Sequence, residues 1–118
     1  MASVYFTTDL IFLSRVQAAA RSAGVQLLTV ASGAALRESM TDNDVRLVIL
    51  DLTAPGCDLA ALVPAVRQAA PDACIVTYAP HVMKAKLAAA QAAGCDQVLT
   101  RGQFDSRLVD LLQSTLDS

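Results

Sequence analysis

Four charged or titratable side chains of this sequence could take part in chemistry, and each lies at or just after the end of a short, mainly apolar segment. They are Asp9, Asp51, His81 and Arg101. Carboxylates bind cations, arginine binds anions, and histidine changes its charge near neutral pH. Whether these side chains can act together depends on the elements that the apolar segments form.

Five short segments rich in β-branched and aromatic residues predict β-strands. They comprise residues 4–7, 25–31, 47–50, 74–79 and 97–101. The third segment, LVIL, is apolar without interruption and ends at Asp51. A continuous apolar strand is typical of a parallel sheet covered on both faces.

Helical spacing of apolar residues, together with capping residues, predicts a helix after each strand. We expect these helices over residues 10–23, 32–40 and 59–70, from Pro80-His81 to a stop at Gly94, and from Asp105 to the terminus. Ser32 and Asp58 are good N-caps, and Gly24 is a typical helix stop. Residues 41–44 are expected to form a loop.

Strands that alternate with helices five times predict one doubly wound α/β domain over residues 1–118. In open sheets of this kind, working residues lie beyond the carboxyl ends of the strands. Asp9, Asp51, residues 79–81 and Arg101 occupy such positions. We therefore expect these side chains at one edge of the sheet.

The composition excludes several classes of protein. Of the 118 residues, 54% are hydrophobic and 17% are charged, and the net charge is -2. A disordered chain is less apolar, and a nucleic-acid-binding protein is more basic. The longest apolar stretch, residues 59–66, is well short of the roughly 20 residues that span a bilayer. We expect a cytoplasmic protein that binds neither nucleic acid nor membrane, with its three cysteines in the core.

Two segments resemble response-regulator receiver domains. Residues 47–58, LVILDLTAPGCD, are similar to the family's third strand, phosphoacceptor aspartate and Pro-containing turn. Residues 88–101, AAAQAAGCDQVLTR, are similar to its alanine-rich fourth helix, the turn after it and the fifth strand. The resemblance covers the whole chain and implies a flavodoxin-like (βα)5 sandwich with strand order 2-1-3-4-5. It also implies that Asp51 occupies the phosphoacceptor position.

The sequence departs from the receiver pattern where that family binds magnesium. Working receivers carry two acidic residues after the first strand. Here the pair is Thr8 and Asp9 if the strand sets the register, or Thr7 and Thr8 if Gly24 sets it. Because Mg²⁺ prefers several carboxylate oxygens, we expect no cofactor, and Asp9 and Asp51 are the ligands if magnesium binds.

The other receiver positions differ as well. Arg101 stands in place of the family's phosphate-binding lysine, and the two switch positions hold Ala79 and Val98 instead of a hydroxyl and an aromatic residue. The missing hydroxyl would supply the contact that couples phosphorylation to a change of shape. The resemblance therefore favours a degenerate receiver, or pseudo-receiver.

Each candidate residue also has a purely structural interpretation. Asp51 could cap the turn after its strand, and Asp9 could cap the first helix. Arg101 could bind phosphate or could form an internal ion pair with Asp51. His81 could titrate or contact phosphate, or it could lie exposed in the first turn of its helix.

Three functions remain open from the sequence. The leading prediction is a pseudo-receiver, not an enzyme, that acts in signal transduction by contact with a protein partner or a second copy. The contact face would comprise the fourth helix, fifth strand and fifth helix, where charges of both signs suit a symmetric contact. The alternatives are a phosphoryl-accepting two-component regulator, with Asp51 as acceptor and Arg101 replacing lysine, and a binder of small anions in the same crevice.

Overall fold

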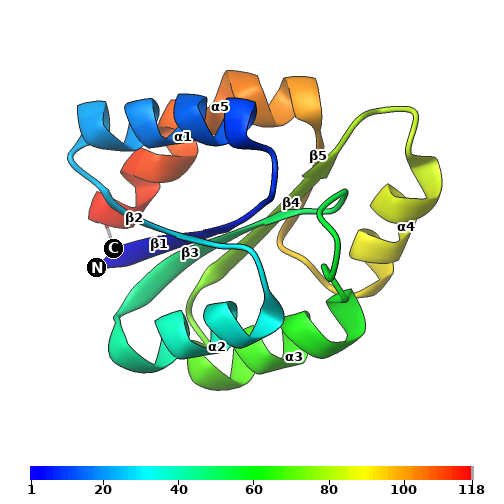
Figure 1. Cartoon of the computed structure of the whole chain (residues 1–118), viewed down its shortest axis with the longest axis horizontal. Helices are drawn as coiled ribbons and strands as arrows, with labels where there is room; N and C mark the ends of the chain where they lie inside the picture. Colours follow the sequence, from blue (N-terminus) through cyan, green and yellow to red (C-terminus); the bar gives the residue numbers. More distant parts are fainter. Residues whose placement is uncertain (118) are drawn as a thin grey trace.

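Five parallel strands form one sheet with helices on both faces in the computed structural model, which describes residues 1–117. The elements are β1 (Ala2–Phe6), α1 (Leu10–Ala23), β2 (Gln26–Val30), α2 (Gly33–Asp42), β3 (Val45–Asp51), α3 (Leu59–Ala69), β4 (Cys74–Ala79), α4 (Lys84–Ala92), β5 (Gln97–Thr100), α5 (Arg101–Ser114) and a final turn of 3-10 helix (Thr115–Asp117). The strand order is β2-β1-β3-β4-β5 (Figure 1). The predicted flavodoxin-like fold and strand order are confirmed.

The helices cover the two faces of the sheet in separate apolar layers (Figure 1). On one face, α1 and α5 contribute buried residues such as Val16 and Phe104. On the other face, α2, α3 and α4 contribute Leu36, Leu62 and Ala90. Strand β3 supplies alternate residues to both layers, because successive side chains of a strand point to opposite faces. Its continuous apolar sequence follows from this double burial.

Local capping signals set most of the helix boundaries. The Ser32 hydroxyl accepts a hydrogen bond of 3.1 Å from the Ala35 N–H at the start of α2, and the Asp58 carboxylate accepts one of 3.1 Å from Ala60 at the start of α3. Gly24 ends α1 with a φ of 71°, a left-handed conformation that favours glycine. Helix α2 continues to Asp42, so the loop predicted from residue 41 begins two residues later.

The predicted starts of α4 and α5 were wrong. Residues 80–83 form a turn in which the Met83 N–H donates to the Pro80 carbonyl, and α4 begins only at Lys84. Helix α5 begins at Arg101, not after Asp105, because Thr100 and Gln103 form a capping box. Each side chain of the pair accepts a hydrogen bond from the other's backbone N–H. Arg101 is therefore the first residue of a helix and not the last residue of a strand.

The strand register aligns the ends of the central strands. Phe6 of β1 lies opposite Leu50 of β3, so the residue after β1 reaches the level of Asp51. Asp51 in turn lies opposite Tyr78 of β4. Three neighbouring strands thus deliver side chains to one place at the carboxyl edge of the sheet.

Within residues 1–117, no helix is long and apolar enough to cross a membrane.

Candidate functional site at the carboxyl edge of the sheet

Asp51, at the end of β3, is held by the side chains of Thr7 and Thr53. The Thr7 hydroxyl donates to Asp51 Oδ2 over 2.7 Å, and the Thr53 hydroxyl donates to Oδ1 over the same distance. The Thr53 backbone N–H adds a bond of 3.0 Å to Oδ1. Only 3% of the Asp51 surface is exposed. The carboxylate is therefore buried, and neutral donors satisfy both of its oxygens.

Arg101 pairs with Asp9 and not with Asp51, so the interpretation of Arg101 as an internal ion-pair partner of Asp51 was wrong. Its Nη2 lies 2.6 Å from Oδ2 of Asp9, and its guanidinium carbon lies 4.8 Å from the centre of the Phe12 ring. The reason is the early start of α5, which packs beside α1. From the first position of α5, the Arg101 side chain reaches the start of α1 and not the end of β3.

Asp9 has a structural role as the N-cap of α1. Its Oδ1 accepts a hydrogen bond of 3.1 Å from the Phe12 N–H, and its other oxygen faces Arg101. The Asp9 N–H donates to the hydroxyl of Thr7, whereas Thr8 is exposed. The sequence left open whether the acidic pair of receivers corresponds to Thr8 and Asp9 or, counted from Gly24, to Thr7 and Thr8. The second alignment describes this geometry, because Thr7 is the residue beside Asp51.

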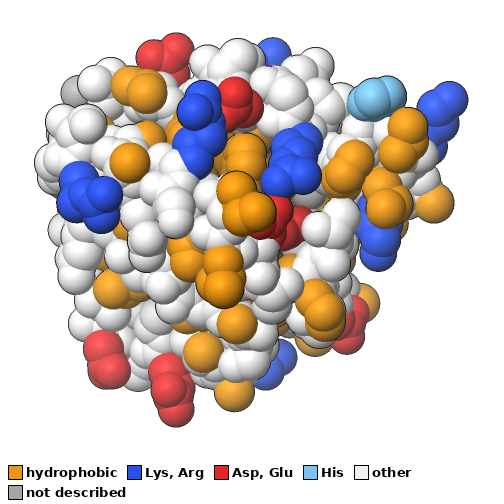
Figure 2. Space-filling view, turned by 45° about the horizontal axis from the view of Figure 1, so that its top comes forward, with side chains coloured by type: hydrophobic (Ala, Val, Ile, Leu, Met, Phe, Trp, Pro, Cys, Tyr) orange, Lys and Arg blue, Asp and Glu red, His pale blue; other side chains and the backbone are white. Residues whose placement is uncertain are grey.

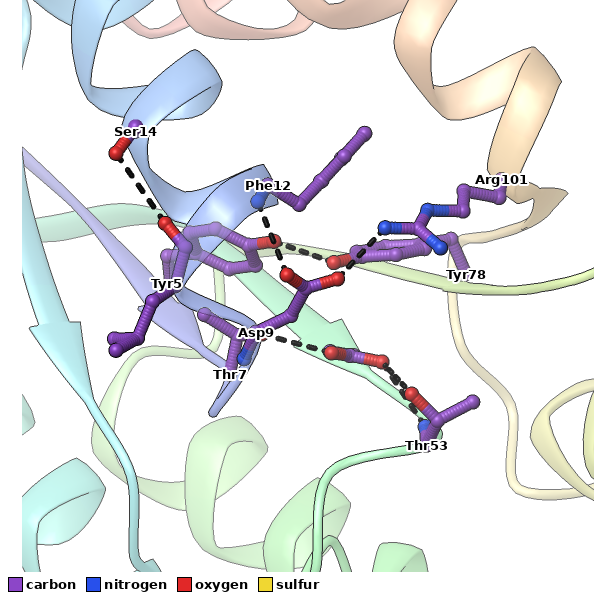
Figure 3. A network of polar contacts seen from close by, with 10 residues as sticks. Tyr5, Thr7, Asp9, Phe12, Ser14, Thr53, Tyr78 and Arg101 are labelled. Atoms are coloured by element: carbon purple, nitrogen blue, oxygen red, sulfur yellow. Dashed lines mark hydrogen bonds and ion pairs between the residues drawn. The ribbon is translucent and has the colours of Figure 1, made fainter.

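A buried pair of tyrosines lies beside Thr7 on the same face of the sheet, and the sequence analysis missed it. The hydroxyls of Tyr5 and Tyr78 form a hydrogen bond with each other (Figure 3). The Tyr78 ring stacks on Phe104, with centroids 4.3 Å apart and planes 3° apart. The alternation of strand side chains could have revealed this group, since Tyr5 precedes Thr7 by two residues.

Burial keeps both tyrosines protonated. It raises the pKa of Tyr5 to about 12. The pKa of Tyr78 is raised further, first by burial and then by its hydrogen bond with Tyr5. Removing a proton from either hydroxyl would place a negative charge in an apolar layer, close to the Asp51 carboxylate. At neutral pH the pair therefore offers hydrogen bonds but no charge.

The remaining candidate residues make none of the hydrogen bonds to the Asp51 carboxylate described above. Ala79 and Val98 pack into the apolar layer of α2, α3 and α4, on the face opposite to Tyr78. His81 is exposed in the turn between β4 and α4.

Burial raises the pKa of all three cysteine thiols, that of Cys57 to about 11, so the thiols are protonated at neutral pH.

Comparison with known proteins establishes the fold. No family model matches the chain, and no curated protein matches it significantly. Three similar solved structures are the receiver domain of NtrX from Brucella abortus (18% identity, TM-score 0.80, 98% of each chain), the chemotaxis response regulator CheY4 of Vibrio cholerae (22%, 0.76, 97% of this chain and 98% of that one), and the receiver domain of the sensor histidine kinase PA1611 from Pseudomonas aeruginosa (18%, 0.79, 99% and 98%). The chain has the fold of response-regulator receiver domains.

The residues of this chain do not fit the magnesium ion that the PA1611 structure coordinates in its active site cleft. Mg²⁺ requires several oxygen ligands in near-octahedral geometry. In this chain both oxygens of Asp51 accept hydrogen bonds from threonine, and Asp9 faces an arginine and an N–H group. Among the described residues, no three His, Cys, Asp or Glu side chains gather as a metal site.

Proposed function

We propose that the chain is a receiver-like signalling module that acts through protein contacts, without a phosphorylation cycle at Asp51. The observation that carries this proposal is the pair of threonine hydroxyls on the buried Asp51 carboxylate. The module would not be an enzyme, and it would need no cofactor. The cytoplasmic location expected from the sequence is part of the same proposal.

A phosphoryl acceptor must present an oxygen to the incoming phosphorus atom, with cations around the transferred group. Oδ2 of Asp51 accepts one hydrogen bond and Oδ1 accepts two, and the carboxylate is buried, so it would first have to become accessible. The neighbouring position that would offer a second carboxylate holds Thr7. In this arrangement, attack of Asp51 on a phosphorus atom and binding of a metal ion beside it are therefore both energetically unfavourable.

Arg101 is a weak substitute for a phosphate-binding lysine. Its charge is already paired with Asp9, and its guanidinium lies over Phe12. A phosphate would compete with the Asp9 carboxylate for the same guanidinium, at a cost to the Arg101–Asp9 pair. The same cost applies to the third hypothesis, the binding of a small anion in the crevice.

The side chains at the two switch positions, Ala79 and Val98, support a module that keeps a single conformation. Phosphorylation changes a protein's shape only if the phosphoryl group interacts differently with two states. Ala79 is buried and has no hydroxyl to move toward Asp51, and Val98 lies in the apolar layer. A second candidate function, phosphoryl acceptance with Arg101 replacing lysine, has no specific contact in its favour.

The proposed means of signalling is a contact through α4, β5 and α5, with a partner protein or a second copy. This face carries Lys84, Lys86, Arg107 and Asp110, all exposed. Val109 adds an apolar side chain that is 50% exposed. Asp96, in the turn before β5, is paired with Arg67 of α3 over 3.0 Å.

The decisive experiment is incubation with acetyl phosphate and Mg²⁺, followed by intact mass measurement. We expect no gain of a phosphoryl group, and no stable binding of the mimic beryllofluoride. A receiver domain that accepts phosphate under the same conditions is the positive control. A mass gain of one phosphoryl group that is lost in Asp51→Asn would overturn the proposal and favour the phosphoryl-accepting regulator.

A further inference from the structure

A hollow of about 300 Å³ lies between the start of α3, the loop after β3 and α4. Apolar side chains line most of it, among them Leu52, Cys57, Leu59 and Ala89. Its volume is at the lower end of the range for ligand pockets, so it suits an apolar side chain better than a whole cofactor. The site around Asp51 uses none of these side chains.

One cation and one carboxylate line this hollow, and its α4 side is positive. Lys86 lines it, and Lys84 lies two residues earlier; these are the only lysines of the chain. Neither lysine forms an ion pair with a residue that the structure describes. The first turn of α4 contains no acidic residue. The acid that lines the hollow, Asp58, is engaged as the N-cap of α3.

Exposed apolar side chains lie next to these lysines. Val82 is 69% exposed and Met83 is 40% exposed, in the turn that leads into α4. Met83 precedes Lys86 by three residues, so the two share one side of the helix start. Figure 2 shows the chain's single histidine, in pale blue, beside hydrophobic side chains and Lys or Arg side chains.

We propose that this hollow docks an acidic amphipathic segment of a partner protein. An apolar side chain of the segment fills the hollow, its neighbours cover Met83 and Val82, and its carboxylates lie against Lys84 and Lys86. This inference rests on the proposed function, which requires a protein partner, and it names the chemistry of that partner. A free small anion would satisfy the lysines but would leave the apolar lining uncovered.

The docked segment would touch the loop that holds Asp51. Leu52 and Cys57 line the hollow, and Thr53 between them donates two hydrogen bonds to the Asp51 carboxylate. The Cys57 N–H also donates to the carbonyl of Ala54, and the Ala54 N–H donates to that of Asp51. One short, hydrogen-bonded loop therefore connects a contact at the hollow with the hydrogen bonds between Thr53 and Asp51.

The test is selection of a displayed random peptide library against the intact chain. We expect the enriched peptides to combine Asp or Glu with Leu, Ile or Phe. Their affinity, measured by fluorescence anisotropy, should fall at least about tenfold for the double variant Lys84→Glu/Lys86→Glu and should decrease with added salt. Arg37→Glu is the matched control, since Arg37 is an exposed cation of α2 that does not line this hollow.

A second pair of variants tests the hollow itself. Ala89→Trp should fill it and abolish peptide binding, whereas Gln91→Trp, at an exposed position near the end of α4 that does not line the hollow, should leave binding intact. Circular dichroism verifies that each variant is folded.

Three results would overturn the inference. They are a selection that yields no acidic, apolar peptides, equal binding to the parent and the lysine variant, and self-association that depends on Lys84, which would assign the hollow to a second copy. A phosphoryl gain at Asp51 with peptide selection intact would contradict only the absence of phosphorylation in the proposed function.

Discussion

Thr7 at the end of β1 donates a hydrogen bond of 2.7 Å to the carboxylate of Asp51 at the end of β3. The two residues are 44 positions apart in the sequence, and both are buried. The Thr7 hydroxyl also accepts a bond from the Asp9 N–H, so one side chain connects the end of β1, the start of α1 and the end of β3.

Replacing Thr7 by valine should destabilise the chain, because it leaves a buried carboxylate oxygen and the Asp9 N–H without a partner. The expected loss in the free energy of unfolding is about 1 to 3 kcal/mol. Urea denaturation measures it. The exposed neighbour supplies the control: Thr8→Val should change stability by less than about 0.5 kcal/mol. Equal effects of the two substitutions would contradict a stabilising role of the Thr7–Asp51 bond.

Asp51→Ala should also lower stability, again by about 1 to 3 kcal/mol, since the hydroxyl donors lose their acceptor. A double-mutant cycle should show coupling between Asp51 and Thr7. No coupling beyond about 0.5 kcal/mol is expected between Asp51 and Arg101, because these residues have different partners. A strong Asp51–Arg101 coupling would restore the ion pair that the structure argues against.

The Asp9–Arg101 pair should contribute little by itself. Both side chains are partly exposed, 34% for Asp9 and 45% for Arg101, and such pairs contribute about 0.2 to 1 kcal/mol. Asp9→Ala also removes the N-cap of α1 and should cost about 1 kcal/mol more than Arg101→Ala. Thermal unfolding at low and high salt compares the two variants, and only the ion-pair contribution should decrease with salt. Equal losses would show that the cap is unimportant.

The two buried tyrosines predict that the folded chain loses stability at alkaline pH. The folded pKa of each is raised above the value of about 10 in an unfolded chain, so their stabilising effect is complete below pH 10 and is lost as pH rises through the folded pKa. For Tyr5 this window extends from pH 10 to about 12. Stability should fall there by up to about 1.4 kcal/mol per pH unit for each tyrosine.

Tyrosinate absorbance during a pH titration, recorded together with circular dichroism, tests this. Both tyrosines of the chain belong to the buried pair, so no exposed tyrosine obscures the signal. Ionisation should coincide with unfolding and shift to lower pH in denaturant. A midpoint near pH 10 in the folded chain would refute the buried pair.

Association through the α4–β5–α5 face should depend on Arg107, which is exposed on α5 beside Asp110. Reversing its charge in Arg107→Glu should weaken self-association or partner binding, independently of any phosphodonor. Sedimentation velocity over a range of concentrations measures self-association, and Arg21→Glu on α1 is the matched control. A chain that stays monomeric, with partner binding indifferent to Arg107, would remove this face from the proposal.

Where local signals acted alone, sequence reasoning predicted the fold well. The limits of α1 and β4 agree with the structure, and Ser32, Asp58 and Gly24 end or begin helices as expected. Two helix starts were nevertheless wrong. The Thr100–Gln103 capping box is itself a local signal and was overlooked, so Arg101 was expected to end a strand.

The sequence by itself determined the order of the elements, the double burial of β3 and the placement of Asp9, Asp51 and Arg101 after strand ends. These features depend on side-chain periodicity and on caps within a few residues. Only the tertiary structure decided which side chains meet. Thr7 reaches Asp51 through the register between β1 and β3, and Arg101 meets Asp9 because α5 packs beside α1. Partners so far apart in the chain depend on how whole elements pack, which no local pattern specifies.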